Sequence, residues 1–309
     1  MEGGKRAREP PVCARAKSMQ QLSYVNTLGE RIDFGALRPL VFCSVRGLGT
    51  PDLDVKTIVG AYQQGDVTAS LTRKARHVDL TLHLLADDRR ALYETRRSLC
   101  GALSPDKAVD GEHRARLLYK NDGGSYWTWA VPEGGLDWGA RLREGHASVR
   151  LSFRCESPYW YGMAPNTARF CYKGSGFQLP FQFPIKFGNR AFRQAVTNAG
   201  HGDAPVEVTI WGKGETPVLV NQSTGRRIAL VSPLPDGDVL RICTDPARLS
   251  VTVTHPDGTT ENAFGYLDAS TSLSAFALRP GENALVYRPG GEQTQSTVHV
   301  NWYDCYEGV

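Results

Sequence analysis

The stretch His77-Val-Asp-Leu-Thr-Leu-His-Leu-Leu85 decides the fold class. Every second residue from Val78 to Leu84 is apolar, and the residues between them are polar or charged. A period of two is typical of a strand with one face in a core and the other in solvent. The stretch from Ala147 to Cys155 repeats this pattern. We therefore expect a mainly β protein built from half-buried strands.

Directly after this strand the period changes to that of a helix. An apolar stripe at helical spacing begins at Leu92, Asp87 or Asp88 is placed to cap the helix, and Pro105 stops it. Capping explains the two aspartates better than an acid pair, because adjacent side chains on a helix point apart. We predict one short helix over residues 87–103.

Short strand-like runs and turn residues fill both halves of the chain. The second half shows no apolar stripe of helix length, and its runs and turns predict a sandwich of two sheets. In the first half, we expect hairpins over 22–34 and 117–131 and a strand over 40–45. In the second half, we expect strands near 206–210, 218–220, 226–231, 249–253 and 298–302, with turns at 221–225, 255–258 and 280–283.

Prolines and aromatic residues interrupt the pattern at Ser157–Asn166, and we place the domain junction between there and about residue 195. We expect a flexible basic arm over residues 1–18, which is rich in lysine and arginine. Residues 19–160 would form an N-terminal β domain, and residues 161–309 a linker and the sandwich.

Composition excludes several classes of protein. The net charge of 36 − 32 = +4 is too mild to indicate nucleic-acid binding by itself. The seven cysteines are scattered without a C-x-x-C pair, which argues against a disulfide framework or a zinc site and favours reduced thiols in a protein made in a cytoplasm. We find no apolar run of about 20 residues that could span a bilayer, and no signal peptide.

Candidate chemical sites are few. His77, Asp79 and His83 share one face of a strand and could bind zinc, but a half-buried strand needs such a polar face in any case. The glycine turns at 46–49 and 212–214 are not followed by the helix of a phosphate-binding loop. No nucleophile-elbow or zinc-protease motif occurs. We expect no catalytic residue, no metal and no cofactor.

The tryptophans leave two interpretations open. Trp127 and Trp129 lie on one face of a strand, next to Tyr126. Such rings can form a platform for sugars or single-stranded nucleic acid, but more often they belong to a core or a subunit contact. The same alternatives hold for Trp211 and Trp302, at strand ends in the second half.

Taken in order, these elements resemble the distal tail protein family of long-tailed bacteriophages, from about Leu22 to Val309. Each motif is weak alone, and the order and spacing carry the resemblance. The basic arm over residues 1–18 departs from it, and the chain lacks the long insertion that holds a carbohydrate-binding module in enlarged members. The motifs are the strand 77–85, the helix with Arg-Arg-Ser-Leu (96–99), the exit Leu-Ser-Pro (103–105), the junction 151–162, and the segments 196–200, 204–212, 220–225, 278–283 and 302–309.

The resemblance implies an N-terminal domain that assembles into a six-fold ring, with a galectin-like C-terminal sandwich outside it. Such a homohexamer joins the tail tube protein to the tail-tip hub protein and leaves a channel through which DNA passes without specific binding. It would also meet tape measure and receptor-binding proteins, in a virion tail tip assembled in the cytoplasm of the host bacterium. A structural component of this kind is not an enzyme.

Two other functions compete with this interpretation. A carbohydrate-binding host-attachment protein would need an exposed aromatic platform with polar groups beside it. A glycan-cleaving enzyme would need two convergent carboxylates, and we identify no such pair in the sequence.

Overall fold

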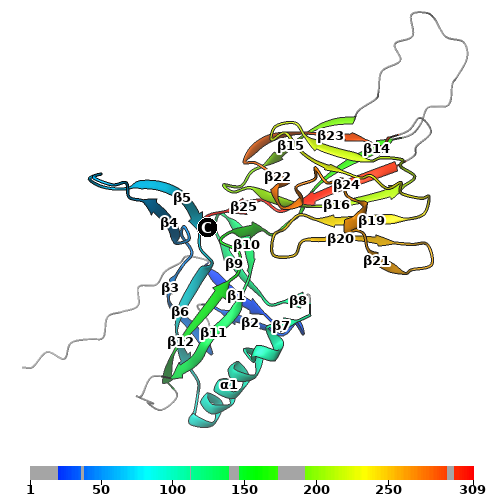
Figure 1. Cartoon of the computed structure of the whole chain (residues 1–309). Coiled ribbons are helices and arrows are strands. Elements are labelled where there is room, and N and C mark those ends of the chain that lie inside the picture. The colour runs from blue at the N-terminus through cyan, green and yellow to red at the C-terminus, as the bar shows by residue number, and fades with distance from the viewer. Residues whose placement is uncertain (1–19, 36–37, 112, 139–145, 173–191, 291–295) are drawn as a thin grey trace, which may run out of the picture. The chain divides into compact units, whose positions relative to one another are not determined.

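The computed structural model describes residues 20–35, 38–111, 113–138, 146–172, 192–290 and 296–309 (Figure 1). The basic arm expected over residues 1–18 lies outside these ranges. The chain divides into two compact units: unit 1 comprises Met1–Pro158 with Gly308–Val309, and unit 2 comprises Tyr159–Glu307. Both are built mainly of antiparallel strands, which confirms the expected fold class.

Unit 1 contains the strands of two sheets, in the orders β2-β1-β9-β10 and β11-β12-β6-β3, and two separate two-stranded ribbons, β4–β5 and β7–β8. The expected hairpins at 22–34 and 117–131 are β1–β2 and β9–β10, and the strand expected at 40–45 is β3. The bounds are β1 Gln21–Val25, β2 Arg31–Phe34, β3 Leu40–Arg46, β4 Leu53–Ile58, β5 Val67–Arg73, β6 Arg76–Leu85, β7 Val109–Asp110, β8 His113–Arg114, β9 Arg116–Asn121, β10 Gly124–Trp129, β11 Val131–Trp138 and β12 His146–Cys155.

The core of unit 1 follows from the alternation in β6 and β12. These strands pair antiparallel over their full length, and Leu80 lies opposite Leu151. Buried and exposed residues alternate along both strands, as the period of two predicts. Tyr24 of β1 stacks on Phe153 of β12 with ring centroids 5.2 Å apart. Side chains from both sheets therefore share one core, and burying each large apolar side chain contributes about 1.5–3 kcal/mol.

Helix α1, Arg89–Ala102, confirms the single expected helix. The Asp88 carboxylate accepts a hydrogen bond from the Ala91 backbone N–H (2.7 Å) and caps the first turn. Asp87 lies outside the helix and binds the Arg38 guanidinium instead (3.0 Å). Leu92 is buried on the inner side of the helix. A 3-10 turn over Pro105–Lys107 (η1) follows.

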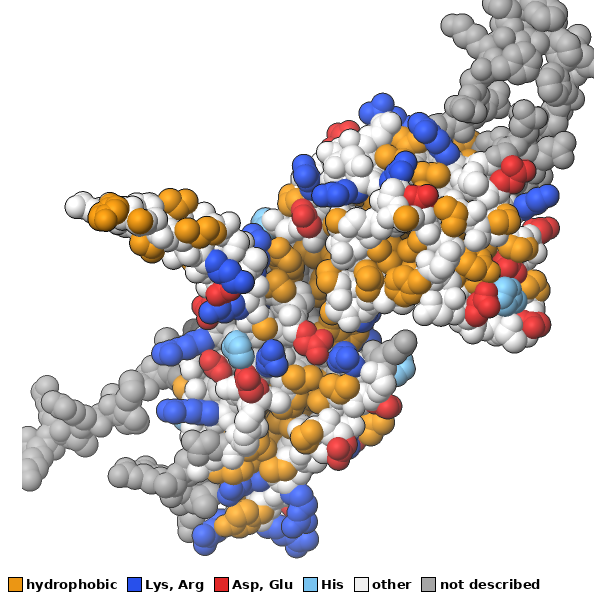
Figure 2. Space-filling model, viewed as in Figure 1, with side chains coloured by type: hydrophobic (Ala, Val, Ile, Leu, Met, Phe, Trp, Pro, Cys, Tyr) orange, Lys and Arg blue, Asp and Glu red, His pale blue; other side chains and the backbone are white. Residues whose placement is uncertain are grey.

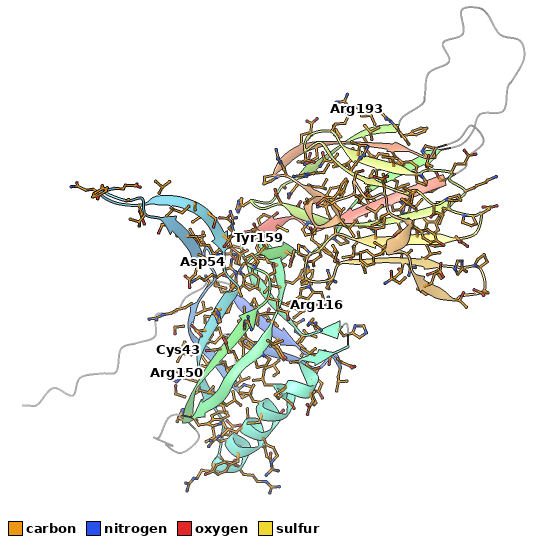
Figure 3. The ribbon with its side chains drawn as sticks, in the orientation of Figure 1. Cys43, Asp54, Arg116, Arg150, Tyr159 and Arg193 are labelled. Carbon is orange, nitrogen blue, oxygen red and sulfur yellow. The ribbon has the colours of Figure 1, made fainter. Side chains whose placement is uncertain are left out.

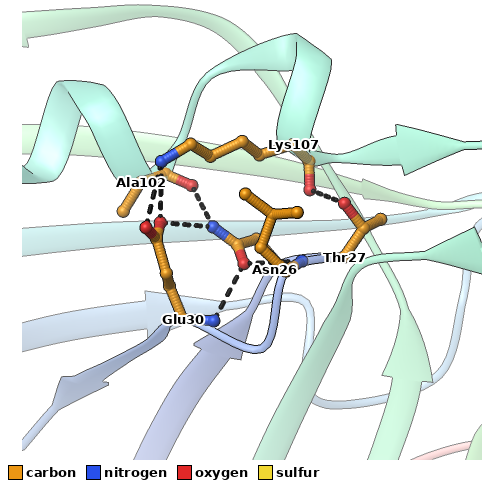
Figure 4. Close-up of polar contacts among 6 residues, drawn as sticks. Asn26, Thr27, Glu30, Ala102 and Lys107 are labelled. Atoms are coloured by element: carbon orange, nitrogen blue, oxygen red, sulfur yellow. Dashed lines mark hydrogen bonds and ion pairs between the residues drawn. The ribbon is translucent and has the colours of Figure 1, made fainter.

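A polar cluster joins the β1–β2 turn to the segment after α1 (Figure 4). The Asn26 side chain is almost fully buried, and its amide donates to Glu30 Oε2 (2.8 Å) and to the Ala102 carbonyl (3.3 Å). Asn26 Oδ1 accepts from the backbone N–H groups of Leu28 and Glu30. The Lys107 ammonium binds both Glu30 oxygens. The hydrogen bond from Lys107 is the largest cause of a lowered pKa of Glu30, and the hydrogen bond from the Asn26 amide lowers this pKa as well.

Unit 2 contains two sheets that lie as layers in Figure 1. Their strand orders are β14-β24-β16-β19-β20-β21, with β22 paired to β16, and β15-β23-β17-β18; the short strands β13 and β25 pair with each other. The bounds are β13 Trp160–Gly162, β14 Asn166–Tyr172, β15 Phe192–Asn198, β16 Ala204–Gly212, β17 Val218–Asn221, β18 Arg226–Ala229, β19 Val239–Cys243, β20 Ser250–Thr254, β21 Thr260–Asn262, β22 Ala277–Leu278, β23 Gly281–Arg288, β24 Ser296–Trp302 and β25 Cys305–Tyr306, with 3-10 turns η2 Phe264–Tyr266 and η3 Leu273–Ala275.

The two layers of unit 2 share a core of alternating side chains. Val208 of β16 lies opposite Val300 of β24, and both are fully buried. Tyr287 of β23 is buried as well, and its hydroxyl lies 2.9 Å from Ser296 Oγ of the other layer. The described part of unit 2 therefore forms the sandwich of two sheets that the turn spacing predicts. Among the described helices of the whole chain, none combines the length and the apolar character needed to cross a bilayer.

Candidate assembly surface

The most unusual surface of unit 1 is the ribbon formed by β4 and β5 and their connecting turn, residues 53–73, which we call the arm. It projects from the rest of unit 1 in Figure 1. The arm continues the paired strands β3 and β6, because β4 follows β3 and β6 follows β5. The Lys74 backbone N–H donates to the Asp52 carbonyl (2.8 Å) and closes the base of the arm.

The arm exposes an unusual amount of apolar surface. Of the fourteen large hydrophobic side chains that are exposed in the described residues, seven lie in the arm. Figure 2 shows these hydrophobic side chains gathered over the ribbon. Their exposed fractions run from 50% to 107%: Leu53, Val55, Ile58, Val59, Tyr62, Val67 and Leu71. Single exposed apolar residues are ordinary, but a contiguous group of this size marks an interaction surface.

The strand register explains how these side chains group. Val55 lies directly opposite Leu71, and Ile58 lies opposite Val67, with a register shift between Lys56 and Thr57. Side chains of directly opposed residues share one face of a ribbon. Within the described residues no further strand pairs with either outer edge of the arm. A lone two-stranded ribbon is marginally stable in water, so a partner that covers these pairs would stabilise the arm.

The polar residues singled out as a metal site do not converge. His77 Nδ1 lies 2.7 Å from Glu133 Oε2, while the Asp79 carboxylate accepts from the Ser152 hydroxyl (2.6 Å). His83 lies on the same exposed face without joining them. Among the described residues no group of three or more His, Cys, Asp or Glu side chains could hold a metal ion. This face therefore makes structural ion pairs and hydrogen bonds.

Of the two tryptophans of β10, Trp127 belongs to the core and Trp129 is half-buried. Trp127 is only 6% exposed and contacts Trp129 edge to face, with ring centroids 4.9 Å apart. The Arg116 guanidinium, labelled in Figure 3, lies 5.2 Å from the centroid of Trp129 and 5.7 Å from that of Trp127. The buried Trp127 ring therefore does not offer an open face for a sugar. In unit 2, Trp302 is buried, and Trp211 contacts the His299 ring at 4.5 Å.

A linked set of titratable groups lies at the β20–β21 turn of unit 2. His255 Nδ1 lies 3.1 Å from the buried Asp238 carboxylate, and Nε2 lies 3.6 Å from Glu261. The hydrogen bond with Asp238 is the largest cause of a raised His255 pKa. Tyr266 donates to Glu261 (3.1 Å). Both imidazole nitrogens thus face a carboxylate.

The described thiols differ in burial, and Cys243 is half-buried. Cys155 and Cys305 are fully buried, and burial raises the pKa of Cys155 to about 12 and that of Cys305 further still. Cys43 and Cys100 are exposed. Because the thiolate is the reactive form, the buried pair is poorly suited to nucleophilic chemistry.

The arm was not anticipated from the sequence, although a signal was present. Leu53 and Val55 alternate with polar residues, Val67 and Leu71 do so more loosely, and glycines lie in the intervening turn at 60 and 65. This is the pattern of a hairpin with Gly-containing connection.

The chain matches no family model and no curated protein sequence. Solved structures do resemble it. The SPP1 Dit protein, described as a paradigm of the hub adsorption apparatus in phages that infect Gram-positive bacteria, superposes with a TM-score of 0.62 at 14% identity, over 91% of this chain and 98% of that one.

Chains of the phage P2 baseplate in its activated conformation are similar too. The form with Ca has a TM-score of 0.55 at 11% identity, over 94% of this chain and 99% of the other. The form with Sr has a TM-score of 0.51 at 12% identity, over 91% and 97%. Sequence identities this low establish the shared fold. Over nearly its whole length, the chain has the fold of the SPP1 Dit protein.

Proposed function

We propose that the chain is a structural component of a phage tail tip, a distal tail protein that forms a ring between the tail tube and the tail-tip hub. The exposed arm carries the proposal, because each of its seven large apolar residues is at least half exposed in the described chain. The shared fold with SPP1 Dit supports the same role. A tail-tip location in the virion, after assembly in the host cytoplasm, follows from the proposal.

A ring gives the arm a specific task. Identical subunits close a ring through a head-to-tail interface, in which one surface of each subunit meets a different surface of the next. The arm extends the reach of unit 1 on one side, and its apolar pairs would be buried against the neighbouring copy. We propose six copies, with unit 1 forming the ring and a galectin-like unit 2 outside it. The channel would pass DNA without specific contacts.

The other expected partners are the tail tube and hub proteins, with tape measure and receptor-binding proteins as further neighbours. The described polar groups favour a non-enzymatic role. His255, the most engaged histidine, is held between two carboxylates, and His77 is paired with Glu133. Within the described part of the chain, no nucleophile hydrogen-bonds to either imidazole, as covalent catalysis would require.

The test measures particle mass over a range of concentrations, with and without the tail tube protein. Leu71→Asp places a charge within the apolar group of the arm and should leave monomers where the natural chain forms rings. Thr197→Asp is the matched control, because Thr197 is exposed on the edge strand β15. It should assemble like the natural chain. Rings formed equally well by Leu71→Asp, or a natural chain that stays monomeric beside the tube protein, would contradict the proposal.

A further inference from the structure

The base of the arm is held by a buried arginine. Arg76, the first residue of β6, is 2% exposed although its guanidinium carries a full charge. Nη1 donates to the carbonyls of Gly47 (2.6 Å) and Gly49 (2.5 Å). Nε and Nη2 both donate to the Pro158 carbonyl (3.1 and 2.7 Å). A buried cation is tolerated only where its donors are satisfied in this way.

The loop that receives these bonds joins β3 to the arm. It runs from Gly47 to Asp52. The carbonyls of Gly47 and Gly49 accept from Arg76, and the Leu48 carbonyl accepts from the Val309 backbone N–H (3.1 Å). The first three carbonyls of the loop are therefore all engaged. Gly47 has φ +91°, and a Cβ there would lie 1.9 Å from the His77 carbonyl oxygen. The loop is therefore packed directly on the backbone of β6 and admits no side chain at this position.

These contacts bear on the direction of the arm. On one side, the six residues 47–52 connect it to β3, and on the other side only Lys74 and Ala75 connect it to β6. Glycines permit many backbone conformations, so a loop with two of them would allow the ribbon to swing. Three fixed carbonyls remove that freedom.

We propose that Arg76 is a positioning residue for assembly: it fixes the loop 47–49 and thereby sets the direction in which the arm leaves unit 1. This inference rests on the proposed function of the arm. An assembly surface that is ordered in advance loses less conformational entropy on binding. Arginine is required, because a lysine ammonium lacks the planar fork that reaches separate carbonyls from one position.

Hydrogen exchange of the full chain, kept below its assembly concentration, tests the clamp directly. Arg76→Lys should speed exchange about tenfold or more in residues 47–53 and in the arm, as expected for the loss of hydrogen bonds to a charged group. Exchange in the middle of β6 and β12 should not change. Arg150→Lys is the matched control on an exposed position of β12 (Figure 3).

Val309→Pro provides a second variant in case Arg76→Lys unfolds the unit. It removes the N–H that binds the Leu48 carbonyl and leaves the Arg76 hydrogen bonds in place, so it should speed exchange in the loop to a smaller degree. Two results together would overturn the proposal that Arg76 clamps the loop. Loop exchange would be unchanged in Val309→Pro, and Arg76→Lys would either show unchanged exchange or unfold globally.

Particle mass at high concentration then tests the link to assembly. Both variants should need higher concentrations than the natural chain to form rings, while Arg150→Lys should not. Faster exchange in the arm with unaltered assembly would refute the positioning role. A natural chain that never assembles would refute the proposed function, whereas the exchange result would still report on the clamp.

Discussion

Val55 and Leu71 lie directly opposite each other on the arm, and 52% and 57% of these side chains remain exposed. Replacing both by threonine should change the free energy of unfolding by less than about 0.5 kcal/mol, because exposed positions contribute little to folding. Leu82→Ala, in the core strand β6, should cost about 2–5 kcal/mol. Urea denaturation of monomeric protein measures both. A large loss of stability in the threonine variant would show that the arm packs on the rest of unit 1.

The cap of α1 predicts a difference between two neighbouring aspartates. Asp88→Ala removes the acceptor for the Ala91 N–H and should destabilise unit 1 by about 0.5–2 kcal/mol. Asp87→Ala removes only an exposed ion pair with Arg38, which contributes about 0–1 kcal/mol. Thermal denaturation followed by circular dichroism ranks the two. Equal losses would argue that the Asp88 carboxylate does not act as the cap.

The cluster around Asn26 predicts a large effect from one amide. Asn26→Ala removes an almost fully buried amide that makes four hydrogen bonds and should cost about 2–4 kcal/mol, since a typical hydrogen bond contributes about 0.5–1.5 kcal/mol. Asn262→Ala removes a similar bond to the Phe264 N–H at an exposed turn and should cost far less. Chemical denaturation compares them, and similar losses would count against the buried network.

The His255 contacts predict a pH dependence in unit 2. Its folded pKa is raised above the unfolded value of about 6.5, chiefly by Asp238. The stability that this histidine contributes is therefore fully present below about pH 6.5 and is lost as the pH rises through the folded pKa. The melting temperature of the natural chain should fall over that interval, and His255→Gln should flatten the fall.

A second histidine acts in the opposite direction. Burial and nearby Arg169 lower the pKa of His299, so its contribution to stability is lost as the pH falls. His299→Gln should therefore leave the alkaline fall in melting temperature intact. If His255→Gln and the natural chain show the same alkaline profile, the Asp238 contact does not stabilise unit 2.

Period and turn chemistry predicted the helix and many of the strands, but not, for example, β19, β23 or the ribbon of β4 and β5. The alternation at 77–85 and 147–155 predicted β6 and β12, and the aspartates before Arg89 predicted the start of α1. The local sequence pattern of a strand does not show which other strand it pairs with when the two lie about seventy residues apart, as β6 and β12 do. The His77–Arg154 to Leu85–His146 register of β6 and β12 depends on which apolar faces meet in the core.

The arm and its clamp show why a candidate site can escape sequence reasoning. Apolar alternation indicates a strand, but it does not say whether a core covers the apolar side, and in the arm none does within the described chain. Arg76 binds backbone carbonyls, which every residue carries, so no residue type marks its partners. An arginine at the first position of a strand therefore looks like an ordinary surface charge.

The composition of the arm also limits how the free protein can be handled. Val67-Thr-Ala-Ser-Leu-Thr72 is rich in β-forming residues, contains no charge and no proline, and lies on a ribbon with unpaired outer edges in the described structure. These are the features that promote edge-to-edge aggregation. Asp66 and Arg73 flank the segment and oppose such stacking through their charge. Subunits produced faster than they assemble should therefore precipitate through the arm, and conditions that screen charge should hasten the loss.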